Sequence, residues 1–246
     1  MDVHAPHGGI HTWKDFWIHL GTITIGLLIA IGLEQSVEWM HRIHERHVLQ
    51  GELRAEGEEN KKAMQVDIER LRFQRSGMVA RRKDVQQLIA SRDKLKLQFR
   101  VIPPSGTIAL PSESTWDSAK ASGKVALLPD YQSDVYSFLY LQNEWLKTQA
   151  ESMFALSSER QVFERGFDPK FADSGEDGTP DLASMSVADL KEYSDILDKN
   201  VTQVDSMIAF LQFFDMVNRA VLDGADSQEE VIRRVDEAAN YKTGPQ

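Results

Sequence analysis

Cysteine is absent from this sequence, and histidine is absent after position 47. The lack of cysteine excludes a disulfide framework. The seven histidines lie at positions 4, 7, 11, 19, 41, 44 and 47. Ser-His-Asp and Cys-His catalytic systems, like ordinary zinc sites, therefore cannot form within one copy of the region that follows. These absences favour a protein that is not an enzyme.

The sequence also has no excess of basic residues over acidic ones. The chain contains 28 Lys or Arg and 38 Asp or Glu, which gives a net charge of −10 at pH 7. Nucleic-acid binding needs a concentrated basic surface that neutralises phosphate groups. The charge balance therefore argues against a nucleic-acid partner.

Residues 16–33 contain no Asp, Glu, Lys or Arg. At 1.5 Å per residue an 18-residue helix rises about 27 Å, close to the hydrocarbon thickness of a bilayer. Trp13 and Trp17 stand at one end and Trp39 beyond the other, where indole rings favour the membrane boundary. The pattern predicts a transmembrane helix surrounded by lipid. A buried helix of a soluble protein is the alternative.

No small-residue cleavage site follows this segment, because Glu34, Gln35 and Glu38 come next. We therefore expect an uncleaved signal anchor rather than a secretory signal peptide. A single-pass topology follows, since no second segment of this kind occurs in the sequence.

The charges on either side of the anchor bear on which side of the membrane holds the large domain. Lys14 precedes the segment, whereas Arg42 and Arg46 follow it, and this count would keep the C-terminal domain in the cytoplasm. However, long domains cross largely regardless of charge, and a short N-terminal tail usually stays inside. We therefore expect an exported domain.

The remainder of the chain shows helical periodicity without a convincing alternating strand pattern. Residues 34–100 contain no proline, and one apolar stripe recurs there at spacings of three, four and seven residues. It consists of Met64, Ile68, Leu71, Met78, Val85 and Ile89. The anchor should continue directly into this helix. Arg75 and Arg82 interrupt the stripe, so one helix of a bundle is expected rather than a long coiled coil.

Proline and glycine positions and two capping boxes divide the rest of the chain. We expect loops near 101–115 and 166–185, a short helix that begins near Trp116, and a helix over 130–165. Ser186-x-x-Asp189 and Ser227-x-x-Glu230 should start the last two helices. Residues 130–165 should bury Val135, Phe138, Leu139, Leu146, Met153 and Phe154. The next helix should bury Ile196, Met207, Phe210, Leu211, Phe214 and Val217.

The predicted fold class is all-α. It consists of a His-containing tail at 1–15, a transmembrane helix at 16–33, and an antiparallel helical bundle at 34–246 into which that helix continues.

Two segments resemble a family of uncharacterised bacterial single-pass membrane proteins that carry an N-terminal anchor and a helical domain. The first is Thr22-Ile-Thr-Ile-Gly-Leu-Leu-Ile-Ala-Ile-Gly-Leu-Glu-Gln35. The second is Thr115-Trp116-Asp-Ser-Ala119 with Ser122-Gly123 and Val125-Ala-Leu-Leu-Pro129. The resemblance implies an inner-membrane protein of unknown biochemical role whose large domain lies on the periplasmic side. It supplies no catalytic residue.

Small residues recur along one face of the anchor. Thr22, Gly26 and Ala30 form a doubled small-xxx-small pattern, which lets two helices approach closely in lipid. The pattern predicts a helix–helix interface between copies of the chain. A chance arrangement in a lone anchor is the alternative, because these residue types are common in membrane helices.

His19 lies inside the apolar segment, and Glu38-x-x-His41 follows it. An ionisable group in a membrane span needs a partner, a cavity or the interface. In a parallel homodimer both features would be duplicated, and paired Glu-x-x-His sequences are typical of carboxylate-bridged di-iron sites. His19, Glu38 and His41 are therefore candidate metal ligands. Interfacial and tail histidines are the alternative.

The leading hypothesis is a non-enzymatic, membrane-anchored protein that acts in protein–protein interaction or scaffolding and binds no cofactor. Trp145, Tyr131, Tyr136 and Tyr140 are candidate partner contacts, or else core residues. One alternative is a redox or sensory protein that binds a metal ion or haem through the N-terminal histidines. Another is a carboxylate-based enzyme acting on an envelope polymer, which would need two facing acids in a cleft.

Overall fold

The computed structural model describes residues 13–90, 108–174 and 178–243, and these residues contain helices and no strand. The elements are α1 (Trp13–Ala90), α2 (Ser114–Ala121), the 3-10 helix η1 (Lys124–Leu127), α3 (Asp130–Arg165), α4 (Pro169–Ser174), α5 (Val187–Leu222) and α6 (Gln228–Thr243). The all-α prediction is confirmed. The chain divides into two compact units, residues 1–50 and residues 51–246.

Helix α1 confirms that the apolar segment continues without a break into the long helix that carries the stripe. Proline would interrupt the backbone hydrogen bonds of a helix, and none occurs over these 78 residues. Of the expected tail, residues 1–12 lie outside the described residues, whereas residues 13–15 already belong to α1.

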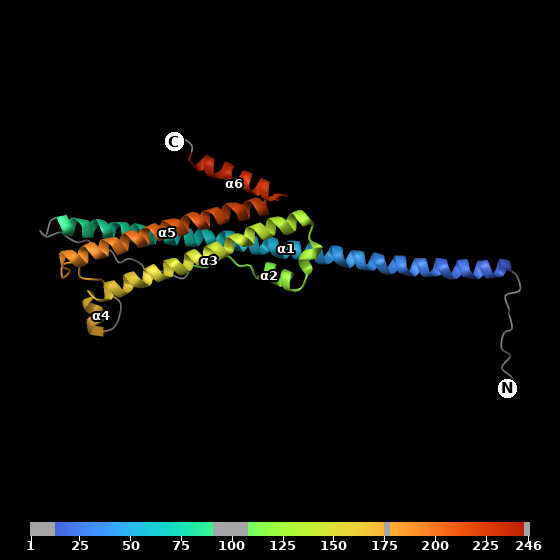
Figure 1. Cartoon of the computed structure of the whole chain (residues 1–246), viewed down its shortest axis with the longest axis horizontal. Helices are drawn as coiled ribbons and strands as arrows, with labels where there is room; N and C mark the ends of the chain where they lie inside the picture. Colours follow the sequence, from blue (N-terminus) through green and yellow to red (C-terminus); the bar gives the residue numbers. More distant parts are fainter. Residues whose placement is uncertain (1–12, 91–107, 175–177, 244–246) are drawn as a thin grey trace, which may run out of the picture. The chain divides into compact units, whose positions relative to one another are not determined.

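In the unit that spans residues 51–246, α3 and α5 lie side by side and run antiparallel (Figure 1). Phe163 stacks on Tyr193 with ring centroids 5.4 Å apart, and Gln203 Nε2 donates to Gln149 Oε1 at 3.0 Å. Residues with lower numbers in α3 contact residues with higher numbers in α5, as is required for two antiparallel helices. Leu139 and Leu146 of α3 are almost fully buried.

Residues 51–90 of α1 complete the bundle. The predicted stripe is confirmed at Met64, Ile68, Leu71, Met78 and Val85, which are buried, whereas Ile89 is half-buried. The two arginines that interrupt the stripe form ion pairs with α5, Arg75 with Asp205 and Arg82 with Asp198. These interactions support the expected bundle helix.

The segment before α2 runs back along α1. Ala109 N donates to Asp67 Oδ2 at 2.9 Å, and Ser112 N donates to Asn60 Oδ1 at 2.7 Å. Because higher residue numbers in this segment meet lower numbers in α1, the chain returns towards the start of the bundle before α3 begins. Helices α1 and α3 consequently run in the same direction, and α5 runs opposite to both (Figure 1). The sequence pattern did not indicate this return.

At Gly57 α1 comes close to α5. A Cβ atom at this position would lie 3.0 Å from Leu222 Cδ2 and 3.1 Å from Asn218 Oδ1. Asn218 Nδ2 also donates to the Gly57 carbonyl oxygen at 2.7 Å. Glycine therefore allows the two backbones to come together at this crossing.

The predicted helix boundaries are largely confirmed. The expected helix over 130–165 coincides with α3, and α2 begins at Ser114, two residues before the expected start. The Ser186 capping box is present: Ser186 Oγ accepts from Asp189 N at 3.2 Å, and Asp189 Oδ2 accepts from Ser186 N at 2.8 Å. Helix α5 ends at Leu222, as the following Gly224, with a φ of 80°, allows.

The expected loop near 166–185 is wrong in one part, because it contains α4. Asp168 Oδ1 accepts from Lys170 N at 3.0 Å and from Phe171 N at 3.3 Å, and Pro169 occupies the first helical position. Asp at the N-cap and Pro at the next position both favour a helix start. The high Gly, Asp and Pro content of residues 166–185 favours a loop, although Asp168 and Pro169 indicate a helix start.

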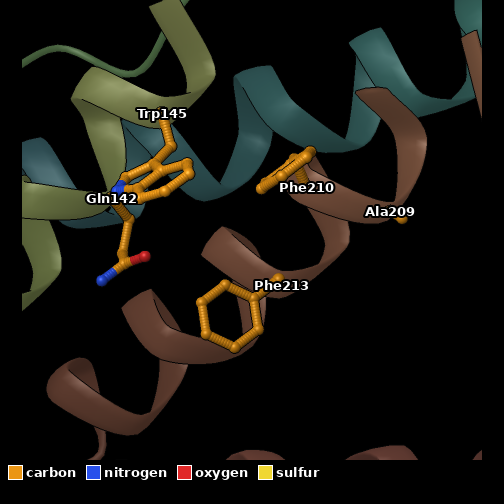
Figure 2. A pocket seen from close by; sticks show the side chains of 5 residues that line it. All are labelled: Gln142, Trp145, Ala209, Phe210 and Phe213. Carbon is orange, nitrogen blue, oxygen red and sulfur yellow. The ribbon is translucent and has the colours of Figure 1, made fainter. Parts of the chain in front are cut away.

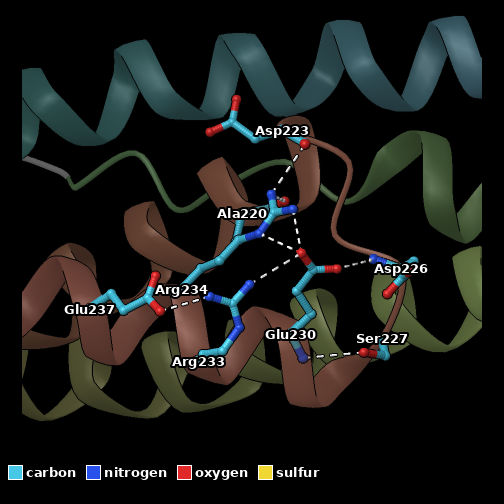
Figure 3. Close-up of polar contacts among 8 residues, drawn as sticks. All are labelled: Ala220, Asp223, Asp226, Ser227, Glu230, Arg233, Arg234 and Glu237. Atoms are coloured by element: carbon cyan, nitrogen blue, oxygen red, sulfur yellow. Dashed lines mark hydrogen bonds and ion pairs between the residues drawn. The ribbon is translucent and has the colours of Figure 1, made fainter.

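The start of α6 differs slightly from the predicted capping box (Figure 3). Ser227 Oγ accepts from Glu230 N at 3.2 Å, but the Glu230 carboxylate accepts from Asp226 N at 3.2 Å instead of the Ser227 amide. Hydrogen bonds from Arg234, together with the Asp226 amide, lower the pKa of Glu230 to about 2. Arg234 also donates to the Asp223 carbonyl oxygen at 3.1 Å, which ties α6 to the end of α5.

Candidate functional site

The apolar segment of α1 is exposed on all sides. All eleven large apolar side chains between residues 16 and 33 are between 39% and 68% exposed. One helix among the described residues is thus long and apolar enough to cross a membrane. Trp13, Trp17 and Trp39, the predicted boundary residues, are exposed too.

The predicted small-residue face is open. Thr22, Gly26 and Ala30 follow one another at four-residue spacing on α1, so they share one side of the helix. The Thr22 hydroxyl donates to the Ile18 carbonyl oxygen at 2.9 Å, and a Cβ atom at Gly26 would have no neighbour within 4 Å. Among the described residues of one chain, therefore, no contact requires glycine at position 26.

The candidate metal ligands are spread along α1. His19 lies nineteen residues before Glu38, which corresponds to about 28 Å along a helix. Glu38 accepts from Arg42 at 2.5 Å, and His41 Nε2 lies 3.6 Å from Glu45 Oε1. The described residues of one copy bring no three His, Asp or Glu side chains together as a metal site. A site shared by two copies stays a prediction, and the histidines at 4, 7 and 11 lie outside the described residues.

A buried polar cluster surrounds Glu56. Its Oε1 accepts from Ser112 Oγ at 2.7 Å and from Thr115 N at 3.1 Å, and its Oε2 accepts from Tyr140 Oη at 2.9 Å. Burial by itself would raise the pKa of Glu56, but these hydrogen bonds together hold it below its usual value. Burial and the Glu56 carboxylate raise the pKa of Tyr140.

The Glu56 cluster attaches the return segment and α2 to the bundle. Trp116 stacks on Tyr140 with ring centroids 5.7 Å apart, and Asn143 Nδ2 donates to the Pro111 carbonyl oxygen at 2.9 Å. Both oxygens of Glu56 are engaged by protein groups. Its role is therefore structural, and its acidic side chain offers no free base for catalysis.

An open pocket of about 430 Å³ lies between α3 and α5 (Figure 2). Gln142 and Trp145 from α3 line one side, and Ala209, Phe210 and Phe213 from α5 line the other. In Figure 2 the rings of Trp145 and Phe210 lie on opposite sides of the opening. Three aromatic rings and one amide form a predominantly apolar site, as is common for binding pockets.

The four aromatic residues proposed as partner contacts have different surroundings. Trp145 is 59% exposed and lines the pocket, and Tyr131 is exposed. Tyr136 is half-buried, and Tyr140 is buried in the Glu56 cluster, so Tyr140 is a core residue. On the predicted buried face of α3, the prediction for Phe154 is wrong, because its side chain is 71% exposed, and Phe138 is only half-buried. Helical spacing alone does not distinguish the buried aromatic positions of α3 from the exposed ones.

The sequence pattern does not indicate the pocket. Phe210, a predicted core residue, is half-buried as a pocket wall, and Phe213 lies outside the predicted buried face of α5. The feature of the sequence that points to the pocket is the cluster of Phe210, Phe213 and Phe214. These three side chains are too close together on one helix to share a single narrow buried face. Phe214 alone of these three is fully buried.

The resemblance to a bacterial single-pass family therefore rests on residues 22–35 and 115–129 alone and stays a prediction. No protein-family model, curated protein or solved structure matches this chain.

Proposed function

We propose that this chain is a non-enzymatic, single-pass membrane protein whose helical bundle binds another protein through the pocket between α3 and α5. The observation that carries the membrane part of the proposal is the exposure of every large apolar side chain between residues 16 and 33. Exposed apolar surface is unfavourable in water at about 25 cal/mol per Å². Lipid around this segment removes that cost.

The proposed location is the bacterial inner membrane, with the domain after the anchor on the periplasmic side. The resemblance of residues 22–35 to bacterial anchors supports the membrane. The same resemblance supports the orientation, and long domains cross the membrane largely regardless of charge.

Self-association through the anchor is part of the same proposal. The Thr22, Gly26 and Ala30 face would allow close packing of two helices in lipid. Replacement of Gly26 by Ile would place a branched side chain on that face, whereas the chain itself leaves open space there. We expect Gly26→Ile to abolish dimers in detergent and to leave the helix content unchanged. Unchanged association would remove this part of the proposal.

Protein binding is favoured over catalysis because of what the pocket contains. Trp145, Phe210 and Phe213 provide apolar contact area, and aromatic anchors of this kind dominate many protein interfaces. Gln142, the polar lining residue, cannot act as an acid or a base. The chemistry of the lining therefore supports recognition.

Photocrosslinking in the native membrane tests the proposal. A photoreactive phenylalanine derivative replaces Trp145 in one variant and the exposed Phe154 in a matched control on the same helix. We expect a covalent adduct with a specific protein from position 145 and none from position 154. Equal adducts from both positions, or none from position 145, would reject the pocket as the binding site.

A further inference from the structure

The part of α1 that follows the apolar segment carries a further exposed face. Leu33, Val37 and Met40 are 63%, 63% and 59% exposed. His44 and His47, which are exposed too, continue the same alternating spacing of four and three residues. This is the spacing of the core positions of a coiled coil. These five residues are called the heptad face below.

The heptad face is open beyond the membrane surface. Met40 lies seven residues after the end of the apolar segment, about 10 Å along the helix axis, whereas lipid headgroups extend about 5–7 Å beyond the hydrocarbon. Among residues 33–50, all of which the structure describes, Leu49 alone is buried. It follows Met40 by nine residues, about two and a half turns, and therefore lies on the opposite side of α1.

The heptad face continues the small-residue face of the anchor. Gly26 precedes Leu33 by seven residues, and Ala30 precedes Val37 by seven. Seven residues are about two helical turns, so these residues share one side of α1. A helix that packs on the anchor in the membrane therefore meets the heptad face as it leaves the membrane.

The charges on this part of α1 favour pairing with an identical helix. In a symmetric parallel pair each residue meets its own counterpart, so a charged residue in the contact would face a like charge. None of the heptad face is Asp, Glu, Lys or Arg, although five of the fifteen residues 34–48 are charged. These five are Glu34, Glu38, Arg42, Glu45 and Arg46. The heptad face is thus free of the charges that would prevent self-pairing.

We infer that the heptad face binds the same face of a second copy, so that the two α1 helices form a parallel coiled coil over residues 33–47 outside the membrane. The inference rests on the self-association included in the proposed function and names the surface that extends it. Two copies anchored in the same direction present their heptad faces at the same height. The paired His44 and His47 side chains are polar positions within the contact, and such positions fix the register of a coiled coil.

Disulfide crosslinking in native membranes tests the inference. The chain contains no cysteine, so Met40→Cys reports one position of the full-length protein. Arg42→Cys is the matched control, because Arg42 is 66% exposed and lies only about 3 Å further along the axis, on the other side of the helix. A disulfide requires Cα atoms within about 7 Å. Copper phenanthroline should therefore give at least fivefold more covalent dimer from position 40 than from position 42.

A second pair of variants tests the same contact without crosslinking. Met40→Glu would place two carboxylates opposite each other, and like charges across an interface are strongly unfavourable. Sedimentation in detergent should show dimers weakened at least tenfold, whereas Trp39→Glu, at the neighbouring exposed position, should change them less than threefold.

Equal disulfide yields from positions 40 and 42, no disulfide from position 40, or undiminished dimers of Met40→Glu would overturn the inference. None of these results would affect the proposed function, which the Gly26→Ile variant and the crosslink from position 145 test separately.

Discussion

The close packing of α1 against α5 at Gly57 leads to a testable prediction. Alanine there would bring its Cβ to 3.0 Å from Leu222 Cδ2 and 3.1 Å from Asn218 Oδ1, compared with about 3.5–4.0 Å for favourable carbon contacts. Leu222 is buried, and Asn218 is held by its bond to the Gly57 carbonyl, so neither moves away freely. Overpacking of this kind costs about 1–3 kcal/mol.

A matched glycine separates this steric cost from helix propensity. Alanine is favoured over glycine in a helix by about 1 kcal/mol, and a Cβ at Gly51 would meet nothing within 4 Å. Gly51→Ala should therefore raise the free energy of unfolding. Gly57→Ala should be less stable than Gly51→Ala by about 1–3 kcal/mol.

Urea unfolding of the full-length protein in detergent micelles, followed by far-UV circular dichroism, measures both glycine variants. If Gly57→Ala stabilises the protein as much as Gly51→Ala does, the close packing of α5 against Gly57 is refuted.

Three further predictions concern the bundle. Glu56→Ala should lower the free energy of unfolding in urea by about 2–4 kcal/mol, because it leaves the Tyr140 hydroxyl buried without its acceptor; a loss below 0.5 kcal/mol would contradict this. Hydrogen bonds hold the pKa of Glu56 below 4.5, so its stabilisation is present above pH 4.5 and disappears as pH falls through the native pKa. Acid titration of stability should accordingly be steeper for the native chain than for Glu56→Gln, and parallel curves would argue against the cluster. Ser186→Ala should cost about 1 kcal/mol in the same urea assay through loss of the N-cap, whereas Ser206→Ala within α5 should have a negligible effect.

Local signals predicted the helices well. The Ser186 capping box and the Gly224 stop each depend on a few neighbouring residues, and the sequence contains these in full. The heptad-spaced Met64, Leu71, Met78 and Val85 likewise indicate a buried face, because helical geometry alone places them together. Such features need no knowledge of the partner helix.

The return segment and the pocket could not be predicted in the same way. The bonds of Asn60 and Glu56 to Ser112 join residues more than fifty positions apart, and their polar side chains resemble ordinary surface residues of a helix. The exposure of Trp145 and Phe154 depends on where α5 crosses α3, which a single helical stripe does not specify. Tertiary contacts therefore determine the candidate site, whereas the apolar segment at residues 16–33 is apparent from composition alone.

The most direct test asks what surrounds residues 16–33. Because the chain has no cysteine, a single spin label can be attached at Leu27→Cys and, for comparison, at the exposed Val66→Cys. In reconstituted bilayers, the label at position 27 should be accessible to oxygen and protected from a water-soluble nickel complex, with the reverse at position 66. A label at position 27 that the nickel complex reaches as readily as it reaches position 66 would contradict a lipid-embedded anchor.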